Sequence, residues 1–182
     1  MSSNMKAINI LGINGSIRTN SSSHAVINQV IKHFPIHTQF TLFERLADIP
    51  AFDGSETDPE PVADFKVQIK EAHGIVICTP EYAHGVPGAL KNALDWTVGT
   101  GDFLNKPVAL ITASSQGEKG HEAMQHILLA LAAKLYPSTT LLISSIRAKV
   151  KEGRIIDAPT IDSIKNVSCH FIGSIENLSF EL

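Results

Sequence analysis

Short apolar runs alternate along the chain with longer stretches in which apolar residues recur every three or four positions. The short runs are rich in aliphatic and β-branched residues and predict strands, whereas the longer stretches predict amphipathic helices. The predicted strands cover residues 7–12, 38–43, 74–79, 107–112 and 139–144. The predicted helices run from about residue 25 to Pro35, and over 62–72, 89–98, 121–135 and 159–172 or beyond. The acidic stretch 44–61, with three prolines, is expected to be a loop.

Strands separated by helices predict a parallel sheet with right-handed crossovers. For a chain of this length we expect an open doubly wound sheet, and the flavodoxin-like strand order 2-1-3-4-5 is one of its two common forms. The predicted fold is therefore α/β: a five-stranded parallel sheet in three α/β/α layers, with residues 1–182 forming a single domain. Ligands of such sheets bind outside the carboxyl ends of the strands, which singles out the loops after strands 1, 3 and 4.

Composition and charge narrow the class of protein further. Among 182 residues, fifteen Lys and Arg and eighteen Asp and Glu give a formal net charge of −3, which argues against a nucleic-acid partner. Two cysteines, Cys78 and Cys169, are too few for a disulfide framework or a four-thiolate metal site. Apolar runs are too short to cross a bilayer and residues 1–6 do not resemble a signal peptide, so we expect a cytoplasmic protein without a membrane partner.

The loop after the first predicted strand, residues 12–23, is suited to a phosphate. It leads into the N-terminus of a helix, where free N–H groups and the helix dipole favour an anion. Arg18 supplies its formal charge, and the hydroxyl donors are those of Ser16, Thr19, Ser21, Ser22 and Ser23. The loop has neither the P-loop pattern nor the dinucleotide fingerprint. The alternative is that these serines only cap the helix and form its preceding loop.

The loop after the third predicted strand carries the most specific pattern. Residues 79–96 read T-P-E-Y-A-H-G-V-P-G-A-L-K-N-A-L-D-W. This resembles the hallmark P-E-Y-N-x-x-x-P-G-x-L-K-N-A-I-D-W of the NADPH-dependent FMN reductase family. Residues 15–23 and 115–120 also resemble that family's G-S-x-R-x-x-S-x-N and S-x-G-x-x-G loops, and residues 46–50 its segment after strand 2. The matches are collinear from about residue 7 to residue 135.

The resemblance implies an FMN site. It places the phosphate at the serines and Arg18 of the first loop, and the isoalloxazine ring along the loop after strand 3. The implied cofactor-binding residues are Ser16, Arg18, Ser21, Ser22, Ser23, Pro80, Glu81, Tyr82, Ala83, Gly85, Ser115 and Gly117. Two positions depart from the family pattern, because Ala83 and Ser23 stand where the family has Asn. Alanine at position 83 lacks the amide that could reach the flavin, and the side chain of His84 could make that contact instead.

The implied activity is transfer of a hydride from NADPH or NADH to N5 of FMN. The electrons would then pass to a small acceptor such as a quinone, an azo dye or free flavin. Because the flavin carries the chemistry, no catalytic side chain is expected. The resemblance further implies a homodimer or homotetramer. Two alternatives stay open: a flavodoxin-type FMN electron carrier, whose flavin NADPH would not reduce, and a flavin-free regulatory member of the fold, which would not bind FMN.

Several other features are expected to be structural. His121 and His126 are five positions apart, so they do not share a helix face as the two histidines of a zinc motif do, and we expect them on the helix surface without a metal. Cys78 lies in a predicted buried strand and is expected to be an inert core thiol. Leu90, Leu94 and Trp96 are expected in the helix core or a subunit contact. The hallmark positions Lys91, Asn92 and Asp95 are expected to be structural or at a subunit interface.

Overall fold

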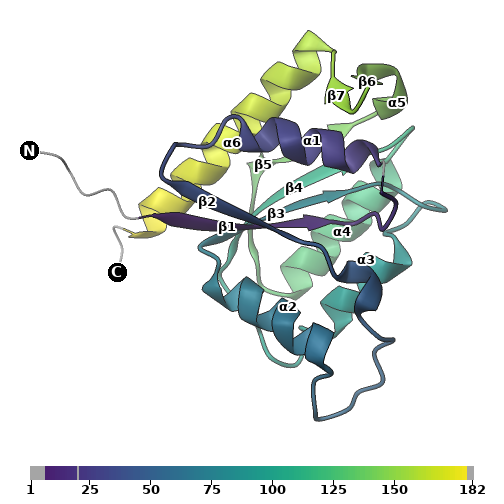
Figure 1. Ribbon diagram of the computed structural model, residues 1–182, viewed down its shortest axis with the longest axis vertical. Coiled ribbons are helices and arrows are strands. Elements are labelled where there is room, and N and C mark those ends of the chain that lie inside the picture. The colour runs from purple at the N-terminus through teal and green to yellow at the C-terminus, as the bar shows by residue number, and fades with distance from the viewer. Residues whose placement is uncertain (1–6, 20, 180–182) are drawn as a thin grey trace, which may run out of the picture.

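A computed structural model describes residues 7–19 and 21–179 of the chain. Five strands form one sheet in the order β2-β1-β3-β4-β5, and every neighbouring pair is parallel (Figure 1). The strands are β1 (Ile8–Asn14), β2 (Thr38–Phe43), β3 (Gly74–Thr79), β4 (Pro107–Ala113) and β5 (Lys134–Ile143). This is the predicted flavodoxin-like order, and the predicted fold class is confirmed.

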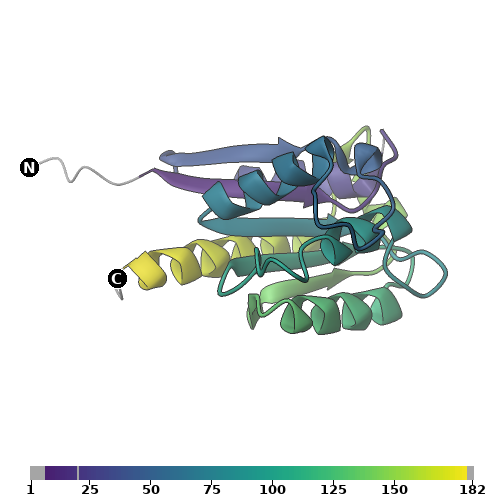
Figure 2. The ribbon, with the colours of Figure 1, turned by 90° about the horizontal axis from the view of Figure 1, so that it is seen from below.

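Helices cover both faces of the sheet (Figures 1 and 2). Helices α1 (Ser22–Ile31) and α6 (Ala158–Ser179) pack on one face, where Phe171 is fully buried. The other face carries α2 (Glu60–Glu71), α3 (Gly88–Asp95) and α4 (Glu118–Ala130). Every residue of β3 and β4 is buried, because helices lie over both sides of these central strands. The edge strand β2 alternates between partly buried and exposed positions up to its last residue, Phe43, which is buried.

The parallel register brings three loops together at one end of the sheet. Asn14 at the end of β1 pairs with Cys78 near the end of β3, and Thr79 pairs with Thr112 near the end of β4. The loops after β1, β3 and β4 therefore lie side by side. In Figure 2 they occupy the end of the sheet opposite the N-terminus of the described chain.

The boundary between α4 and β5 differs from the predicted one. The helix predicted over 121–135 extends too far, because α4 ends at Ala130. The strand predicted over 139–144 is present, but it begins earlier, at Lys134. Ala132 takes a left-handed conformation (φ 56°) and ends the helix, with Ala133 N–H donating to the Leu128 carbonyl at 3.0 Å. Glycine usually marks such a helix end, but the sequence has no glycine at this one. A register shift opposite β4 also lengthens β5.

Four short elements lie outside the predicted set. They are η1 (Leu46–Asp48), α5 (Ile146–Lys149), β6 (Val150–Lys151) and β7 (Arg154–Ile155). Each is too short to leave a periodic pattern in the sequence. No helix in the described part of the chain combines the length and the apolar character that crossing a membrane requires.

Candidate functional site

A hollow of about 480 Å³ lies at the carboxyl end of the sheet, between the loops after β1, β3, β4 and β5; we call it the carboxyl-end hollow. Its lining residues are Ser16, Arg18, Ser21, Ser22, Ser23, Pro80, Glu81, Tyr82, Ala113, Ser114, Ser115, Ile146 and Arg147. Nine of these were predicted from the sequence as cofactor-binding residues. Ala83, Gly85 and Gly117 were also predicted but do not line it, and Ala113, Ser114, Ile146 and Arg147 were missed.

The loop after β1 is organised by the side chain of Asn14, which sequence reasoning did not single out. This buried amide accepts a hydrogen bond from Ser16 N–H at 3.1 Å through Oδ1. Through Nδ2 it donates to Ser21 Oγ at 3.3 Å and contacts His24 Nδ1 at 2.9 Å. One side chain thus fixes both the start of the loop and the first residues of α1. Its signal in the sequence was a polar residue at the end of a buried strand.

The hydroxyls of the loop do not all face the hollow in the same way. Ser16 Oγ lies 3.3 Å from Tyr82 Oη, which joins the loop after β1 to the loop after β3. Ser23 is almost completely buried, and its hydroxyl forms a hydrogen bond with the Cys78 thiol. Burial raises the pKa of that thiol to about 12, so Cys78 is a core thiol, as expected. Ser23 can therefore serve a ligand through its backbone more readily than through its hydroxyl.

The hollow offers an anion both hydrogen-bond donors and positive charge. No side chain caps the N-terminus of α1 in the described residues, and its first turn contains no acidic residue. Within residues 7–19 and 21–179, the guanidinium groups of Arg18 and Arg147 form no ion pair or hydrogen bond with a protein group. The carboxylate of Glu81, the acidic group in the lining, is directed to a backbone N–H instead. Free N–H groups and two unpaired cations suit a phosphate group.

The loops after β3 and β4 are joined by Glu81. Its carboxylate accepts a hydrogen bond of 2.6 Å from Gly120 N–H in the first turn of α4. The helix begins after Gly117, which adopts a left-handed backbone (φ 108°). A Cβ on Gly120 would lie 3.0 Å from Glu81 Cβ and 3.2 Å from the Gly85 carbonyl oxygen. The glycines of the S-x-G-x-x-G pattern therefore permit a left-handed turn and a close approach.

Comparison with known proteins assigns this architecture to a family. Residues 8–147 match the model of the family described as NADPH-dependent FMN reductase. The chain belongs to this family. A quinone reductase of Escherichia coli (strain K12) is 34% identical over 176 residues, covering 90% of this chain and 92% of the relative. An NAD(P)H-dependent FMN reductase of Pseudomonas aeruginosa is 30% identical over 159 residues, covering 82% and 85%.

Solved structures agree on the fold. The flavoenzyme NAD(P)H:(acceptor) oxidoreductase FerB of Paracoccus denitrificans superposes with a TM-score of 0.74 at 23% identity, over 94% of this chain and 98% of that one. The family match over residues 8–147 and the curated relatives confirm the resemblance noted in the sequence. The chain is an oxidoreductase of the NADPH-dependent FMN reductase family, for which FMN and NAD(P)H are the expected cofactor and co-substrate.

The family's Asn position, occupied here by Ala83, lies in a tight turn. Tyr82 and Gly85 exchange two backbone hydrogen bonds of 3.0 and 2.9 Å. Between them, Ala83 and His84 both have positive φ, of 49° and 59°. Both central residues of a type I′ turn require this conformation, which asparagine tolerates better than alanine. Ala83 and His84 are exposed beside the hollow and do not line it.

Two hallmark residues, Asn92 on α3 and Trp96 directly after it, hold the segment before α2. The Asn92 amide accepts a hydrogen bond from Phe52 N–H and donates one to the Pro50 carbonyl, both at 2.8 Å. Trp96 Nε1 donates to the same carbonyl at 3.0 Å, and its ring packs edge-on against Phe52. Asn92 and Trp96 are therefore structural residues of this fold. Lys91 and Asp95 form an i,i+4 ion pair on the same helix.

The two histidines of α4 differ in their surroundings. His126 is exposed, as expected, but the same expectation for His121 is wrong. His121 Nδ1 lies 2.8 Å from Thr112 Oγ1 at the end of β4, and burial lowers the pKa of its imidazole. No group of three or more metal-binding side chains is found in the described ranges of the chain.

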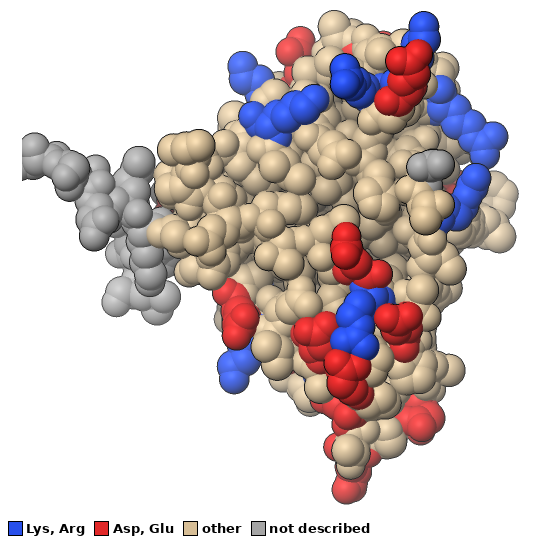
Figure 3. Space-filling view, in the orientation of Figure 1, with Lys and Arg blue, Asp and Glu red and all other residues tan. Residues whose placement is uncertain are grey.

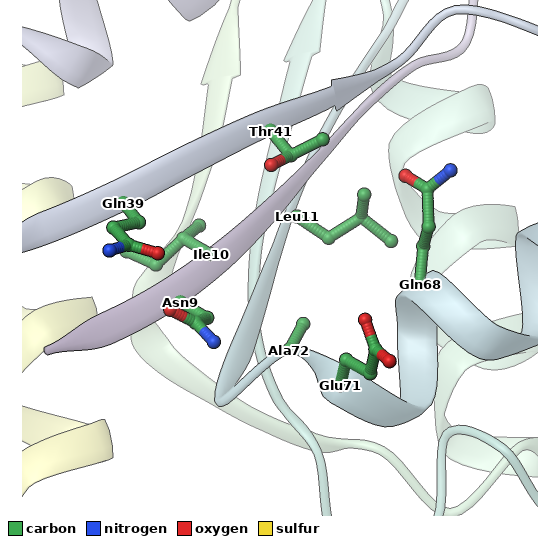
Figure 4. A pocket seen from close by; sticks show the side chains of 8 residues that line it. All are labelled: Asn9, Ile10, Leu11, Gln39, Thr41, Gln68, Glu71 and Ala72. Atoms are coloured by element: carbon green, nitrogen blue, oxygen red, sulfur yellow. The ribbon is translucent and has the colours of Figure 1, made fainter.

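A second hollow, of about 260 Å³, lies at the opposite end of the strands, between β1, β2 and the end of α2 (Figure 4). Its polar lining consists of the amides of Asn9, Gln39 and Gln68, the Thr41 hydroxyl and the Glu71 carboxylate. No cationic side chain lines it. The carboxyl-end hollow, which is lined by Arg18 and Arg147, is therefore the stronger candidate for a phosphorylated cofactor.

Proposed function

We propose that the chain binds FMN in the carboxyl-end hollow and acts as an NAD(P)H-dependent reductase of small acceptors such as quinones, azo dyes or free flavin. The observation that carries this proposal is the hollow itself. It lies at the switch point between β1 and β3, and it combines an uncapped helix N-terminus with unpaired guanidinium groups. Bound FMN would supply the redox chemistry, accepting a hydride at N5 and passing the electrons on.

The chain's own residues would bind and orient this cofactor. The phosphate fits among the N–H groups at the start of α1, the hydroxyls of Ser16, Ser21 and Ser22, and Arg18. The ring fits against Pro80 and Tyr82 on one side, with the loop after β4, including Ser115, on the other. The Ser16–Tyr82 contact would fix the distance between the phosphate end and the ring end of the site.

We also propose that the chain forms a homodimer or homotetramer. Residues 1–182 form one domain, and two or four copies associate so that a neighbouring copy closes the ring side of the hollow. This is consistent with a hollow that is open to solvent beside the exposed side chain of Tyr82. Sedimentation velocity with and without FMN tests it: a dimer or tetramer is expected, and a monomer that retains full activity would contradict it.

FMN titration of the purified chain tests the site. Arg18→Ala should raise the FMN dissociation constant about 10- to 100-fold, because a charge-assisted hydrogen bond contributes about 1.5–3 kcal/mol. Riboflavin lacks the phosphate and should bind both proteins equally. Unchanged FMN affinity would show that the phosphate lies elsewhere. For the reaction, parallel initial-rate lines with NADPH and a quinone are expected if the acceptor replaces the oxidised nicotinamide over the same flavin face.

A further inference from the structure

The loop after β5 brings a positive charge to the carboxyl-end hollow. Arg147, on the short helix α5, lines the hollow together with Arg18 and the serines that begin α1. The family model matches residues 8–147, so Arg147 stands at its last matched position, far from the three family motifs. We propose that Arg147 is a second phosphate-binding cation, which holds the FMN phosphate from the side opposite the loop after β1. This rests on the function proposed above.

Backbone and side-chain hydrogen bonds fix the position of this arginine. Ser145 N–H donates to the Ser115 carbonyl at 3.0 Å, and Ile146 N–H donates to the Ser114 carbonyl at 3.1 Å. The Ser144 hydroxyl adds a third bond, to the Gln116 carbonyl at 3.0 Å. These bonds dock the loop after β5 onto the loop after β4, which lines the same hollow. The arginine therefore extends from a fixed backbone.

The residue before the arginine anchors the turn in the core. Ile146 is 3% exposed and belongs to the apolar cluster between α1, α6 and the sheet. Ser145 adopts a left-handed backbone (φ 55°), which turns the chain sharply at the end of β5. With Ile146 directed inward, the next position in α5 is exposed at the rim of the hollow. The fold thus presents a cation to the hollow without burying it.

The charge around Arg147 is consistent with binding an anion. Residues 145–156 contain four cations and one acid, whereas residues 44–64 contain seven acids and one cation. Figure 3 shows the same bias: blue side chains predominate around α5, β6 and β7, with some red among them, and red ones predominate around α2 and the loop before it, with some blue among them. Arg45 is neutralised within the acidic region by ion pairs with Asp48, Glu60 and Asp64. Arg147 has no such partner among the described residues.

The test compares FMN with riboflavin, which differ only in the phosphate. Arg147→Ala should raise the dissociation constant for FMN about 5- to 20-fold. This effect is smaller than that of losing a buried charged hydrogen bond, because the Arg147 side chain is exposed and its charge is screened by salt. Riboflavin affinity should not change. Arg147→Lys should recover part of the loss, since it keeps the charge but not the two-pronged geometry. The matched control is Arg154→Ala, which removes a nearby exposed arginine that does not line the hollow.

A second signature is the dependence on ionic strength. FMN affinity of the wild-type chain should fall between about 0.05 and 0.5 M salt, and fall less steeply in Arg147→Ala. Equal FMN affinity of wild type and Arg147→Ala, or an equal loss in Arg154→Ala, would overturn the proposal while leaving the FMN site in place. A wild-type chain that binds no FMN would instead overturn the proposed function itself. Melting temperatures of the variants confirm that folding is unchanged.

Discussion

The carboxylate of Glu81 accepts a hydrogen bond of 2.6 Å from Gly120 N–H, although 39 positions separate the two residues. The acid follows β3, and the glycine lies in the first turn of α4. One carboxylate therefore caps a helix and connects two walls of the carboxyl-end hollow. Its side chain is only 7% exposed, and its second oxygen, Oε1, lies 3.8 Å from His84 Nδ1.

Glu81→Gln should lower the free energy of unfolding by about 0.5–2 kcal/mol. The variant keeps an oxygen acceptor but loses the charge that favours the helix N-terminus. FMN affinity should fall with it, because the loop after β3 loses its tie to α4. Urea unfolding and FMN titration measure the two effects. Glu122→Gln is the control: it removes an acid of the same helix that is 61% exposed and should change neither value.

Substitutions at Ala83 distinguish two roles that the family's Asn could have at this position: stabilising the turn, or contacting the flavin. Ala83→Gly and Ala83→Asn should both raise the free energy of unfolding by about 0.5–1 kcal/mol, because both residues accept the φ of 49° at lower cost. Thermal unfolding measures this. FMN affinity should be the same in the two variants. Tighter FMN binding by the Asn variant alone would show that the amide contacts the flavin and that the turn explanation is incomplete.

Asn92 should stabilise the segment before α2. Asn92→Ala removes the two 2.8 Å hydrogen bonds to Pro50 and Phe52, and we expect a loss of about 1–2 kcal/mol because the site is partly exposed. Limited proteolysis should then cut residues 50–59 faster. Lys91→Ala on the same helix breaks only an exposed ion pair, so its effect should stay within about 0.5 kcal/mol. Equal protease sensitivity of the two variants would argue against this role.

His121 should make stability depend on pH. Burial lowers its pKa in the folded state, so the unfolded chain binds the proton more readily. The free energy of unfolding should therefore fall as the pH drops through the ordinary histidine pKa of about 6.5, and level off below the folded-state pKa. Urea unfolding at about pH 7.5 and about pH 5 checks this. The fall should be smaller in His121→Gln and unchanged in His126→Gln, which alters an exposed histidine of the same helix.

Strand pattern predicts most of this fold, because the three central strands β1, β3 and β4 are buried, mainly apolar runs with clear ends. The end of α4 escaped prediction for a physical reason. Ala132 ends the helix in a left-handed conformation that is typical of glycine, and the register shift in β5 depends on its pairing with β4. A local sequence pattern reports only local conformational preferences. The end of α4 and the start of β5 depend on tertiary contacts, so the pattern could not predict them.

Some residues of the candidate site could likewise be predicted from local sequence motifs, whereas others depend on tertiary contacts. Ser16, Arg18 and the residues after β3 lie in loops whose motifs are continuous in sequence, so they could be predicted. Arg147 could not, because its place at the hollow depends on Ser145 and Ile146 bonding to the loop after β4, more than 25 positions away. The exposed position of Ala83, outside the lining, likewise follows from a turn conformation that the motif alone does not reveal.

Anaerobic reduction of the reconstituted protein tests the central claim most directly. The chain is saturated with FMN, excess flavin is removed, and NADPH or NADH is added while the visible absorbance of the oxidised flavin is followed. We predict a yellow protein that bleaches on adding the nicotinamide and regains its colour on adding a quinone. A protein that stays colourless after reconstitution, or a yellow one that only dithionite bleaches, would contradict the account.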